Sequence, residues 1–211
     1  MIIYLLTAAA LLSALLCIYC DYVGNRRGVY VFKPATMIFI IVLAVILVTQ
    51  GAAPTYGFWI IAGLICSLAG DIVLMLPRDR FLGGLLAFLL AHWCYIAAFV
   101  VVAPDPNLVE FLPWLLAGLA VFVLLKPVEP VMRAAVLAYI VSIFAMGWLA
   151  IQYGGEWSGG VPVAIGAGLF MLSDALIGIR RFRSDWPSAQ ALILGSYFPA
   201  QWFFAVSLSA S

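Results

Sequence analysis

The sequence alternates long apolar runs with short breaks that carry turn-forming or charged residues. A membrane-spanning helix needs about 20 mostly apolar residues, and eight of these runs are close to that length. The breaks contain Gly-Asn, Gly-Gly or proline pairs, which favour turns, and none is long enough to hold a soluble domain. The pattern therefore predicts an all-α integral membrane protein whose eight transmembrane helices lie at residues 2–20, 34–50, 57–76, 81–103, 108–125, 130–152, 161–179 and 188–208.

The composition supports a membrane protein and argues against a soluble one. Of the 211 residues, 67% are hydrophobic and 9% are charged, whereas a soluble domain is about 45–50% apolar and about 25% charged. A soluble core of this size could not hide so much apolar surface. We expect a single transmembrane domain over 1–211, surrounded by membrane lipids and without a nucleic-acid partner.

The basic residues follow an alternating pattern along the chain. The first, third, fifth and seventh connections, with the helix ends next to them, contain every Lys and Arg, and the other connections contain none. This alternation matches the positive-inside rule, so we expect these four connections in the cytoplasm and both termini outside, in a bacterial inner (plasma) membrane. The ten residues are Arg26, Arg27, Lys33, Arg78, Arg80, Lys126, Arg133, Arg180, Arg181 and Arg183.

A weak internal repeat is visible at a separation of four helices. A Lys-Pro pair opens the predicted second helix and another precedes the sixth, and a small residue followed by Asp occurs in both the third and the seventh. This spacing would suit a parallel duplication with halves 1–105 and 106–211, although helices often begin after proline for local reasons. The pairs are Lys33-Pro34, Lys126-Pro127, Gly70-Asp71 and Ser173-Asp174.

Few strongly polar side chains remain inside the predicted helices: Asp71, His92, Asp174, Tyr197 and Gln201. A carboxylate at membrane depth costs about 2.5–3.5 kcal/mol on insertion scales, so it marks a function or a partner. Both aspartates lie six residues from the cytoplasmic boundary, or about 9 Å deep at 1.5 Å per residue. We expect them to face each other across a pocket that opens to the cytoplasmic side and is floored by the other three.

Structural explanations remain open for the same residues. Either acid could reach the interface and pair with Arg78 or Arg180, and the other polar groups could simply hold helices together. A catalytic zinc has about three protein ligands and prefers histidine, so the single histidine, His92, makes zinc a poor fit. We expect neither metal nor cofactor, although carboxylates alone could hold Mg²⁺ or Ca²⁺.

At these polar positions the sequence resembles the YhhN family of small multi-spanning membrane proteins, whose animal members are lysoplasmalogenases. The resemblance extends over nearly the whole chain in length and helix number. Its short motifs are specific in combination rather than singly. They are Lys33-Pro34, Gly70-Asp71, Phe81, Gly84, Phe88, His92 with Tyr95, Ser173-Asp174, Arg181-Phe182 and Tyr197 with Gln201.

The resemblance implies hydrolysis of the vinyl ether bond of a lysoplasmalogen, or of a related lysolipid or ether lipid. The products would be a fatty aldehyde and a glycerophospho-base. Asp71 and Asp174 would act as one neutral acid and one charged carboxylate, in an order that the sequence leaves open, and His92 would orient water or a carboxylate. The substrate-binding residues would be Lys33 and Arg181 at the phosphate and Tyr95, Ser173, Tyr197 and Gln201 deeper in the pocket.

Two other function classes fit the intramembrane acids. A proton-coupled transporter of lipids or small molecules would use the same carboxyl groups to carry protons, and the possible duplication favours it. A non-catalytic scaffold or lipid sensor would bind lipid without turning it over. Flux across proteoliposomes without product formation would identify a transporter, and indifference to Asp-to-Asn substitutions would identify a sensor.

Overall fold

The computed structural model describes residues 1–51, 53–77, 79–102, 106–125, 129–153 and 160–209. Within them eight helices are long and apolar enough to cross a membrane, and none of the described residues forms a strand. The prediction of an all-α protein with eight spanning helices is confirmed. The helices are α1 (Ile2–Tyr22), α2 (Arg26–Thr49), α3 (Pro54–Met75), α4 (Phe81–Val102), α5 (Phe111–Leu125), α6 (Pro130–Tyr153), α7 (Gly160–Phe182) and α8 (Ala189–Val206), with short 3₁₀ turns at Leu108–Glu110 and Ser207–Ser209.

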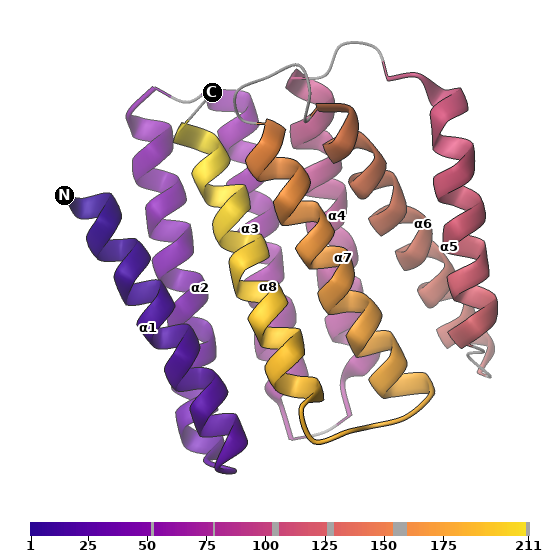
Figure 1. Ribbon diagram of the computed structural model, residues 1–211, viewed down its shortest axis with the longest axis horizontal. Coiled ribbons are helices and arrows are strands. Elements are labelled where there is room, and N and C mark those ends of the chain that lie inside the picture. The colour runs from indigo at the N-terminus through magenta and orange to yellow at the C-terminus, as the bar shows by residue number, and fades with distance from the viewer. Residues whose placement is uncertain (52, 78, 103–105, 126–128, 154–159, 210–211) are drawn as a thin grey trace.

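The helices run up and down, so the described basic residues lie at one end of the bundle. The last turns of α1, α3, α5 and α7 and the first turns of α2, α4, α6 and α8 lie at the lower end in Figure 1. We call this the arginine end. Its position in the cytoplasm stays a prediction from the charge pattern.

The start of α2 differs from the prediction. The helix begins at Arg26, not at residue 34, because the Asn25 side chain accepts a hydrogen bond from the Gly28 backbone N–H (3.1 Å) and caps the first turn. Pro34 therefore lies inside the helix and does not open it. As a result Lys33 lies about two turns inside the helix, where it is only 7% exposed.

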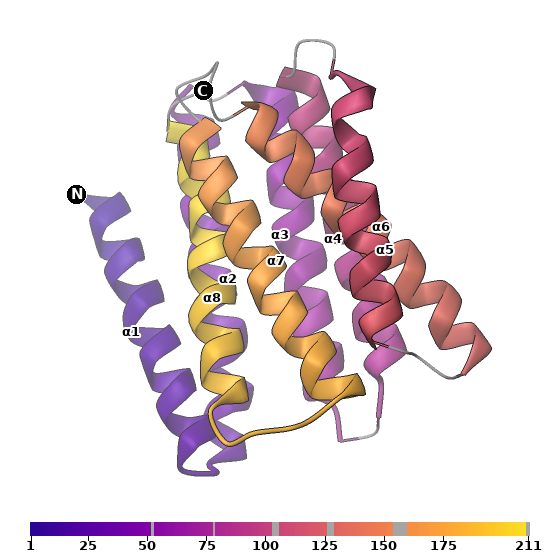
Figure 2. The same cartoon turned by 45° about the vertical axis from the view of Figure 1, so that its right-hand side comes forward.

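The bundle has a packed centre and two less packed edges. The helices α1 and α5 lie at opposite sides of the molecule in Figure 1, and Figure 2 shows α1 standing apart from the other helices at its edge of the bundle. In α5 only Gly118 and Leu125 are buried, whereas most residues of α8 are buried or half-buried. Most of the core therefore lies among α2, α3, α4, α6, α7 and α8, and α1 contributes Ala10, Ala14 and Cys17 at its edge.

Small residues on α3 let the aromatic side chains of α4 approach closely. A Cβ at Gly63 would collide with the Tyr95 ring, and a Cβ at Gly70 would lie 2.8 Å from the Phe88 ring. Close packing of this kind is typical of membrane helices. In lipid the hydrophobic effect does not drive helices together, and small residues let them associate through close van der Waals contact. It fixes α4 against the segment of α3 that carries Asp71.

Helix contacts are similar in the two halves of the chain. In the first half α2 packs against α3 and also against α8, and in the second half α6 packs against α7 and also against α4. A shift of four helices converts the first set into the second. The duplication remains a prediction, and this correspondence supports it.

Candidate active site

The first acid, Asp71 on α3, sits in a buried ion pair. Lys33 Nζ on α2 lies 2.9 Å from Asp71 Oδ1, and the Tyr197 hydroxyl on α8 donates a hydrogen bond to Oδ2 (2.7 Å). Asp71 is 1% exposed, so its charge is balanced inside the protein and not by water. Burial of a charge is tolerated when a partner and hydrogen bonds compensate it. We call these three residues the lysine site.

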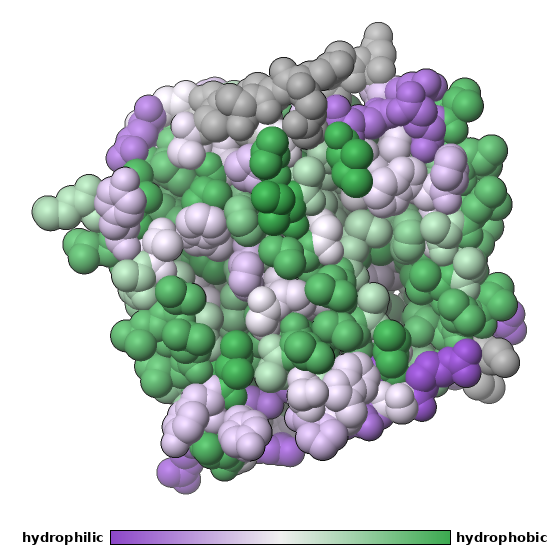
Figure 3. Space-filling view, in the orientation of Figure 1, coloured by the Kyte–Doolittle hydropathy of each residue, from purple (hydrophilic) through white to green (hydrophobic). Residues whose placement is uncertain are grey.

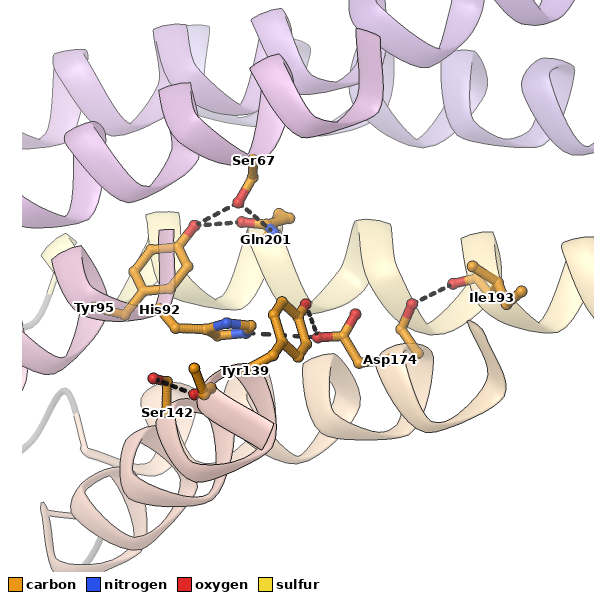
Figure 4. Close-up of polar contacts among 10 residues, drawn as sticks. Ser67, His92, Tyr95, Tyr139, Ser142, Asp174, Ile193 and Gln201 are labelled. Atoms are coloured by element: carbon orange, nitrogen blue, oxygen red, sulfur yellow. Dashed lines mark hydrogen bonds and ion pairs between the residues drawn. The ribbon is translucent and has the colours of Figure 1, made fainter. Parts of the chain in front are cut away.

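The second acid, Asp174 on α7, has different partners. The Tyr139 hydroxyl on α6 donates a hydrogen bond to Asp174 Oδ2 (2.5 Å), and His92 Nε2 on α4 lies 3.5 Å from the same oxygen (Figure 4). No Lys or Arg in the described part of the chain forms an ion pair with this carboxyl group. We call these three residues the cavity site.

The arginine partners considered for the acids can now be placed. Arg180 forms its ion pair with Asp185 (Nε to Oδ1, 2.9 Å), so the alternative that it pairs with Asp174 is wrong. Arg78, the other candidate, lies outside the described residues. Asp174 is therefore held by a phenol and an imidazole, both of which can be neutral.

His92 has unused hydrogen-bonding capacity at the centre of the bundle. The side chain is fully buried, and neither ring nitrogen makes a hydrogen bond with the residues that the structure describes. The rings of Tyr139 and Phe170 pack edge-on against it, at 4.8 and 4.9 Å between centroids. Since buried polar groups are almost always hydrogen-bonded, the imidazole is suited to hold a water molecule or a substrate oxygen beside Asp174.

A cavity of about 450 Å³ adjoins the cavity site between α4, α5, α6 and α7. Its described lining is apolar except for Asp174 and Tyr139. Asp71 does not line it, so the expected pocket shared by both acids is instead lined by one of them. The space-filling view shows mainly apolar side chains around a hollow on this face of the molecule (Figure 3).

Aromatic rings separate the lysine site from the cavity. Phe88 forms part of the cavity wall and packs edge-on against Tyr197 of the lysine site (5.9 Å). Phe170 packs against both rings, at 6.1 Å from Phe88 and 5.8 Å from Tyr197. The two acids thus belong to separate polar networks that meet through packed rings.

Gln201, the remaining residue predicted at the floor of the pocket, belongs to a third network with Tyr95 and Ser67. The Tyr95 hydroxyl donates to Gln201 Oε1 (2.6 Å), and Gln201 Nε2 donates to Ser67 Oγ (3.2 Å), all with completely buried side chains (Figure 4). None of the three lines the cavity. The cluster links α3, α4 and α8, as the interhelical alternative anticipated.

The remaining two predicted residues lie on α7. Ser173 is buried and donates its hydroxyl to the Ile193 carbonyl of α8 (3.2 Å). Arg181 is exposed at the arginine end, where Nη2 lies 2.7 Å from Asp79 and the guanidinium lies 4.8 Å above the Phe81 ring. Its hydrogen bond holds the pKa of the Asp79 carboxyl below the usual value. Phe81 lines the cavity, so Arg181 stands beside one end of it.

Comparison with known proteins identifies a family over most of the chain. The YhhN family model matches residues 28–208, which include both acids, His92 and Tyr139. The chain belongs to the YhhN family. The predicted resemblance is therefore confirmed. No solved structure matches the chain.

Curated relatives cover most of the sequence. Lysoplasmalogenase TMEM86B of Sus scrofa is 31% identical over 80% of this chain and 71% of its own length, and that of Homo sapiens is 33% identical over 68% and 60%. The membrane protein YhhN of Escherichia coli O157:H7, whose name calls it uncharacterized, is 30% identical over 90% of this chain and 93% of its own length. The chain thus spans less than two thirds of the human relative, and it is lysoplasmalogenase-like over most of its length.

Tyr139 is the site residue of this YhhN-family chain that the sequence analysis missed. The motifs of the resemblance do not include it, and its helix matched only as a generic apolar segment. The possible duplication could have pointed to the region of Tyr139. Asp71 and Asp174 are 103 residues apart, and the same shift moves Lys33 to position 136, one turn before Tyr139.

Metal binding has little support from the donor set. The described residues contain no group of three or more His, Cys, Asp or Glu side chains that could hold an ion. His92 and Asp174 supply two donors at the cavity site, fewer than the three that a catalytic zinc usually has. Catalysis without metal or cofactor stays a prediction, and we derive no step through a metal.

Proposed function

We propose that this protein is a membrane-embedded hydrolase that cleaves the vinyl ether bond of a lysoplasmalogen or a related single-chain ether lipid. The products are a fatty aldehyde and a glycerophospho-base. The observation that carries the proposal is the carboxyl group of Asp174, which has no Lys or Arg partner among the described residues and lies in the wall of an apolar cavity. The names of the animal relatives, lysoplasmalogenases, support the choice of reaction.

Asp174 is the proposed acid because its surroundings favour the neutral form. The side chain is 9% exposed, and the described residues provide no ion pair with a lysine or arginine. A charged carboxylate in such a place would cost several kcal/mol, whereas a neutral carboxylic acid costs much less. The acid therefore holds the proton that the reaction needs.

The reaction begins with proton transfer to carbon. The Asp174 carboxyl protonates the β-carbon of the vinyl ether, the double bond is lost, and an oxocarbenium ion forms at the α-carbon. A water molecule held by a ring nitrogen of His92 adds to that carbon, and the Asp174 carboxylate takes one of its protons. The hemiacetal then breaks its bond to the glycerol oxygen, which receives the hydroxyl proton, and the aldehyde leaves. Acid–base help of this kind contributes about 10²–10⁴-fold.

In this proposal Asp71 has the other role, that of a charged carboxylate. The ion pair with Lys33 favours its charged form, and the hydrogen bond that Asp71 accepts fixes the Tyr197 ring. Tyr197 in turn packs against Phe88 in the cavity wall. We therefore assign Asp71, Lys33 and Tyr197 to positioning of the wall and not to contact with substrate.

The phosphate of the substrate is assigned to Arg181. Lys33 was expected at an exposed rim, but it is buried and paired with Asp71. Arg181 is exposed above Phe81 at the end of the cavity, and a guanidinium binds phosphate well. With the positive-inside rule, this end faces the cytoplasm, and lipid would be taken from the inner leaflet of the plasma membrane.

The decisive experiment compares two matched variants, Asp174→Asn and Asp71→Asn, in an aldehyde-release assay with purified protein and lysoplasmalogen. Asp174→Asn should lose about 10²–10⁴-fold in kcat while the protein remains folded, because only the proton donor is removed. Asp71→Asn should lose stability first, since it breaks a buried ion pair. Wild-type turnover in Asp174→Asn would rule out this mechanism.

The same samples separate the hydrolase from a transporter. A buried carboxyl group such as Asp174, which has no Lys or Arg partner among the described residues, could also couple transport to proton movement. The similar helix contacts in the two halves are typical of transporters built from repeats. Wild-type protein in proteoliposomes should release aldehyde without moving intact lipid between leaflets. Lipid movement with no aldehyde would favour the transporter.

A further inference from the structure

We propose that the cavity is the binding site for the hydrocarbon chain of a single-chain lipid, and that the chain enters sideways from the bilayer between α5 and α7. The chemical identity of the lipid rests on the proposed function, but the site and its entrance do not. The proposal assigns a role to the weakly packed helix α5 and to Gly168, which the mechanism does not use.

The entrance follows from how α5 is attached. This helix packs mainly against α6, and only two of its residues are buried. Against α7 it is held by close approach near the arginine end, where a Cβ at Gly178 would lie 3.2 Å from Leu125 Cδ1. The cavity lining also includes Leu172, which is 50% exposed on α7. In a membrane that exposed surface faces acyl chains, so the cavity opens to lipid between these helices.

The cavity has the size and chemistry of a chain site. Its volume of about 450 Å³ falls within the range of about 300–1,000 Å³ that is typical of small-molecule sites. Moving a hydrocarbon chain from the bilayer into an apolar cavity gains little free energy, because both surroundings are apolar. Such a site is useful when it brings a reactive group of the lipid next to a polar side chain. The two polar groups that line the cavity, on Asp174 and Tyr139, are hydrogen-bonded to each other.

Positions along α7 give the direction of the bound chain. Gly168 and Phe182 line opposite ends of the cavity, and Asp174 lies between them, about 9 Å from the first and about 12 Å from the second along the helix. Arg181 stands at the Phe182 end. A lipid with its phosphate there and its reactive bond at Asp174 would extend its chain toward Gly168.

Gly168 leaves open space where that chain would lie. A Cβ built at this position meets no atom within 4 Å, although the residue lines the cavity. Gly168 is exposed, so a large side chain there would occupy the open side of the cavity without displacing packed neighbours. Gly195 on α8 offers a matched control, because it is also an exposed helical glycine with nothing within 4 Å of an added Cβ and does not line the cavity.

The test uses Gly168→Trp, Gly168→Ala and Gly195→Trp, each checked for folding by thermal unfolding in detergent. Binding is read with an acyl lysophosphatidylcholine that carries a diazirine in its chain, and crosslinked peptides are located by mass spectrometry. Crosslinks should fall on α6 and α7 around Gly168. They should be lost in Gly168→Trp, reduced to a smaller extent in Gly168→Ala and kept in Gly195→Trp.

Aldehyde release from a lysoplasmalogen provides the second measurement. Gly168→Trp should lose about 10²-fold with a long alkenyl chain and much less with a short one, since displacement of the reacting bond by about 1 Å can cost that much. Equal crosslinking and turnover in all variants would overturn the proposal. Crosslinks that depend on Gly168, with no aldehyde from any variant, would keep the chain site and reject the hydrolase.

Discussion

The two intramembrane acids occupy comparable positions but have different surroundings. Asp71 on α3 contacts a residue of α2 and a residue of α8, and Asp174 on α7 contacts a residue of α6 and a residue of α4. A shift of four helices relates these two sets of neighbours. At the first acid the contact from the preceding helix is Lys33, whereas at the second it is Tyr139.

In the proposed function this difference separates a positioning acid from a catalytic one. The ammonium group of Lys33 stabilises the charged form of Asp71, so the proposed mechanism does not use this carboxyl as the proton donor. The phenol of Tyr139 donates a hydrogen bond but adds no charge, so Asp174 can hold its proton in an apolar wall. With the proposed duplication, one copy of the site would serve packing and the other the proposed chemistry.

The largest effect should come from making the cavity site resemble the lysine site. Tyr139→Lys would place an ammonium group beside Asp174 and hold it charged, and aldehyde release should fall about 10²–10⁴-fold. Tyr139→Met, which lacks both charge and hydroxyl, is the matched control and should lose only about tenfold. Full activity in Tyr139→Lys would show that the charge state of Asp174 does not matter.

Removing the cation from the lysine site should act on stability. Lys33→Met leaves Asp71 buried without its partner, which typically costs about 3–5 kcal/mol in the free energy of unfolding. The double variant Lys33→Met with Asp71→Asn should recover part of that loss, because no charge then remains unpaired. Unfolding in mixed micelles measures both, and a stable Lys33→Met protein would contradict the ion-pair interpretation.

The two tyrosines allow a smaller but closely matched comparison. Tyr197→Phe removes a hydrogen bond to a charged carboxylate and should cost about 1.5–3 kcal/mol in stability with little change in kcat for the folded fraction. Tyr139→Phe removes a bond to a neutral acid and should lower kcat about tenfold with a smaller loss of stability. Reversed results would exchange the roles of the two acids.

The smallest effect should appear at the arginine end, outside both sites. Asp79→Asn removes the exposed partner of Arg181, and the unfolding midpoint should change little and in a salt-dependent way. The folded pKa of Asp79 is lowered by its bond to Arg181, so its contribution is complete above the unfolded pKa of about 3.9 and is lost as the pH falls through the folded value. Asp185→Asn, beside Arg180, is the matched control. Only Asp79→Asn should alter the KM for a phosphate-bearing lipid, because it changes the charge around Arg181.

Much of the architecture could be predicted because hydrophobicity and charge act locally. Eight apolar runs predicted the eight helices. The alternation of Arg and Lys predicted which helix ends lie together at one end of the bundle. The start of α2 could not be found this way, since the cap at Asn25 outweighs the proline that was expected to open the helix. Because the start of α2 was predicted too late in the sequence, Lys33 was expected at the helix end and not in a buried position.

The candidate site was only half predictable. The costly acids and His92 stand out in any apolar segment, and the structure describes all three in buried polar contacts. Tyr139 does not stand out, because a tyrosine in a membrane helix is common and inexpensive. Tyr95, Gln201 and Ser173 carry polar atoms as well, yet their hydrogen bonds go to each other or to the backbone.

By itself, the sequence determined that this chain is a membrane protein, how many spanning helices it has, and which ionisable groups lie within them. Each of these depends on whether a short segment is more stable in lipid or in water. The tertiary structure alone decided which acid meets a lysine and which meets a cavity. Those neighbours come from helices far apart in the chain, and the protonation of a buried carboxyl is set by the charges that packing brings within a few ångströms of it.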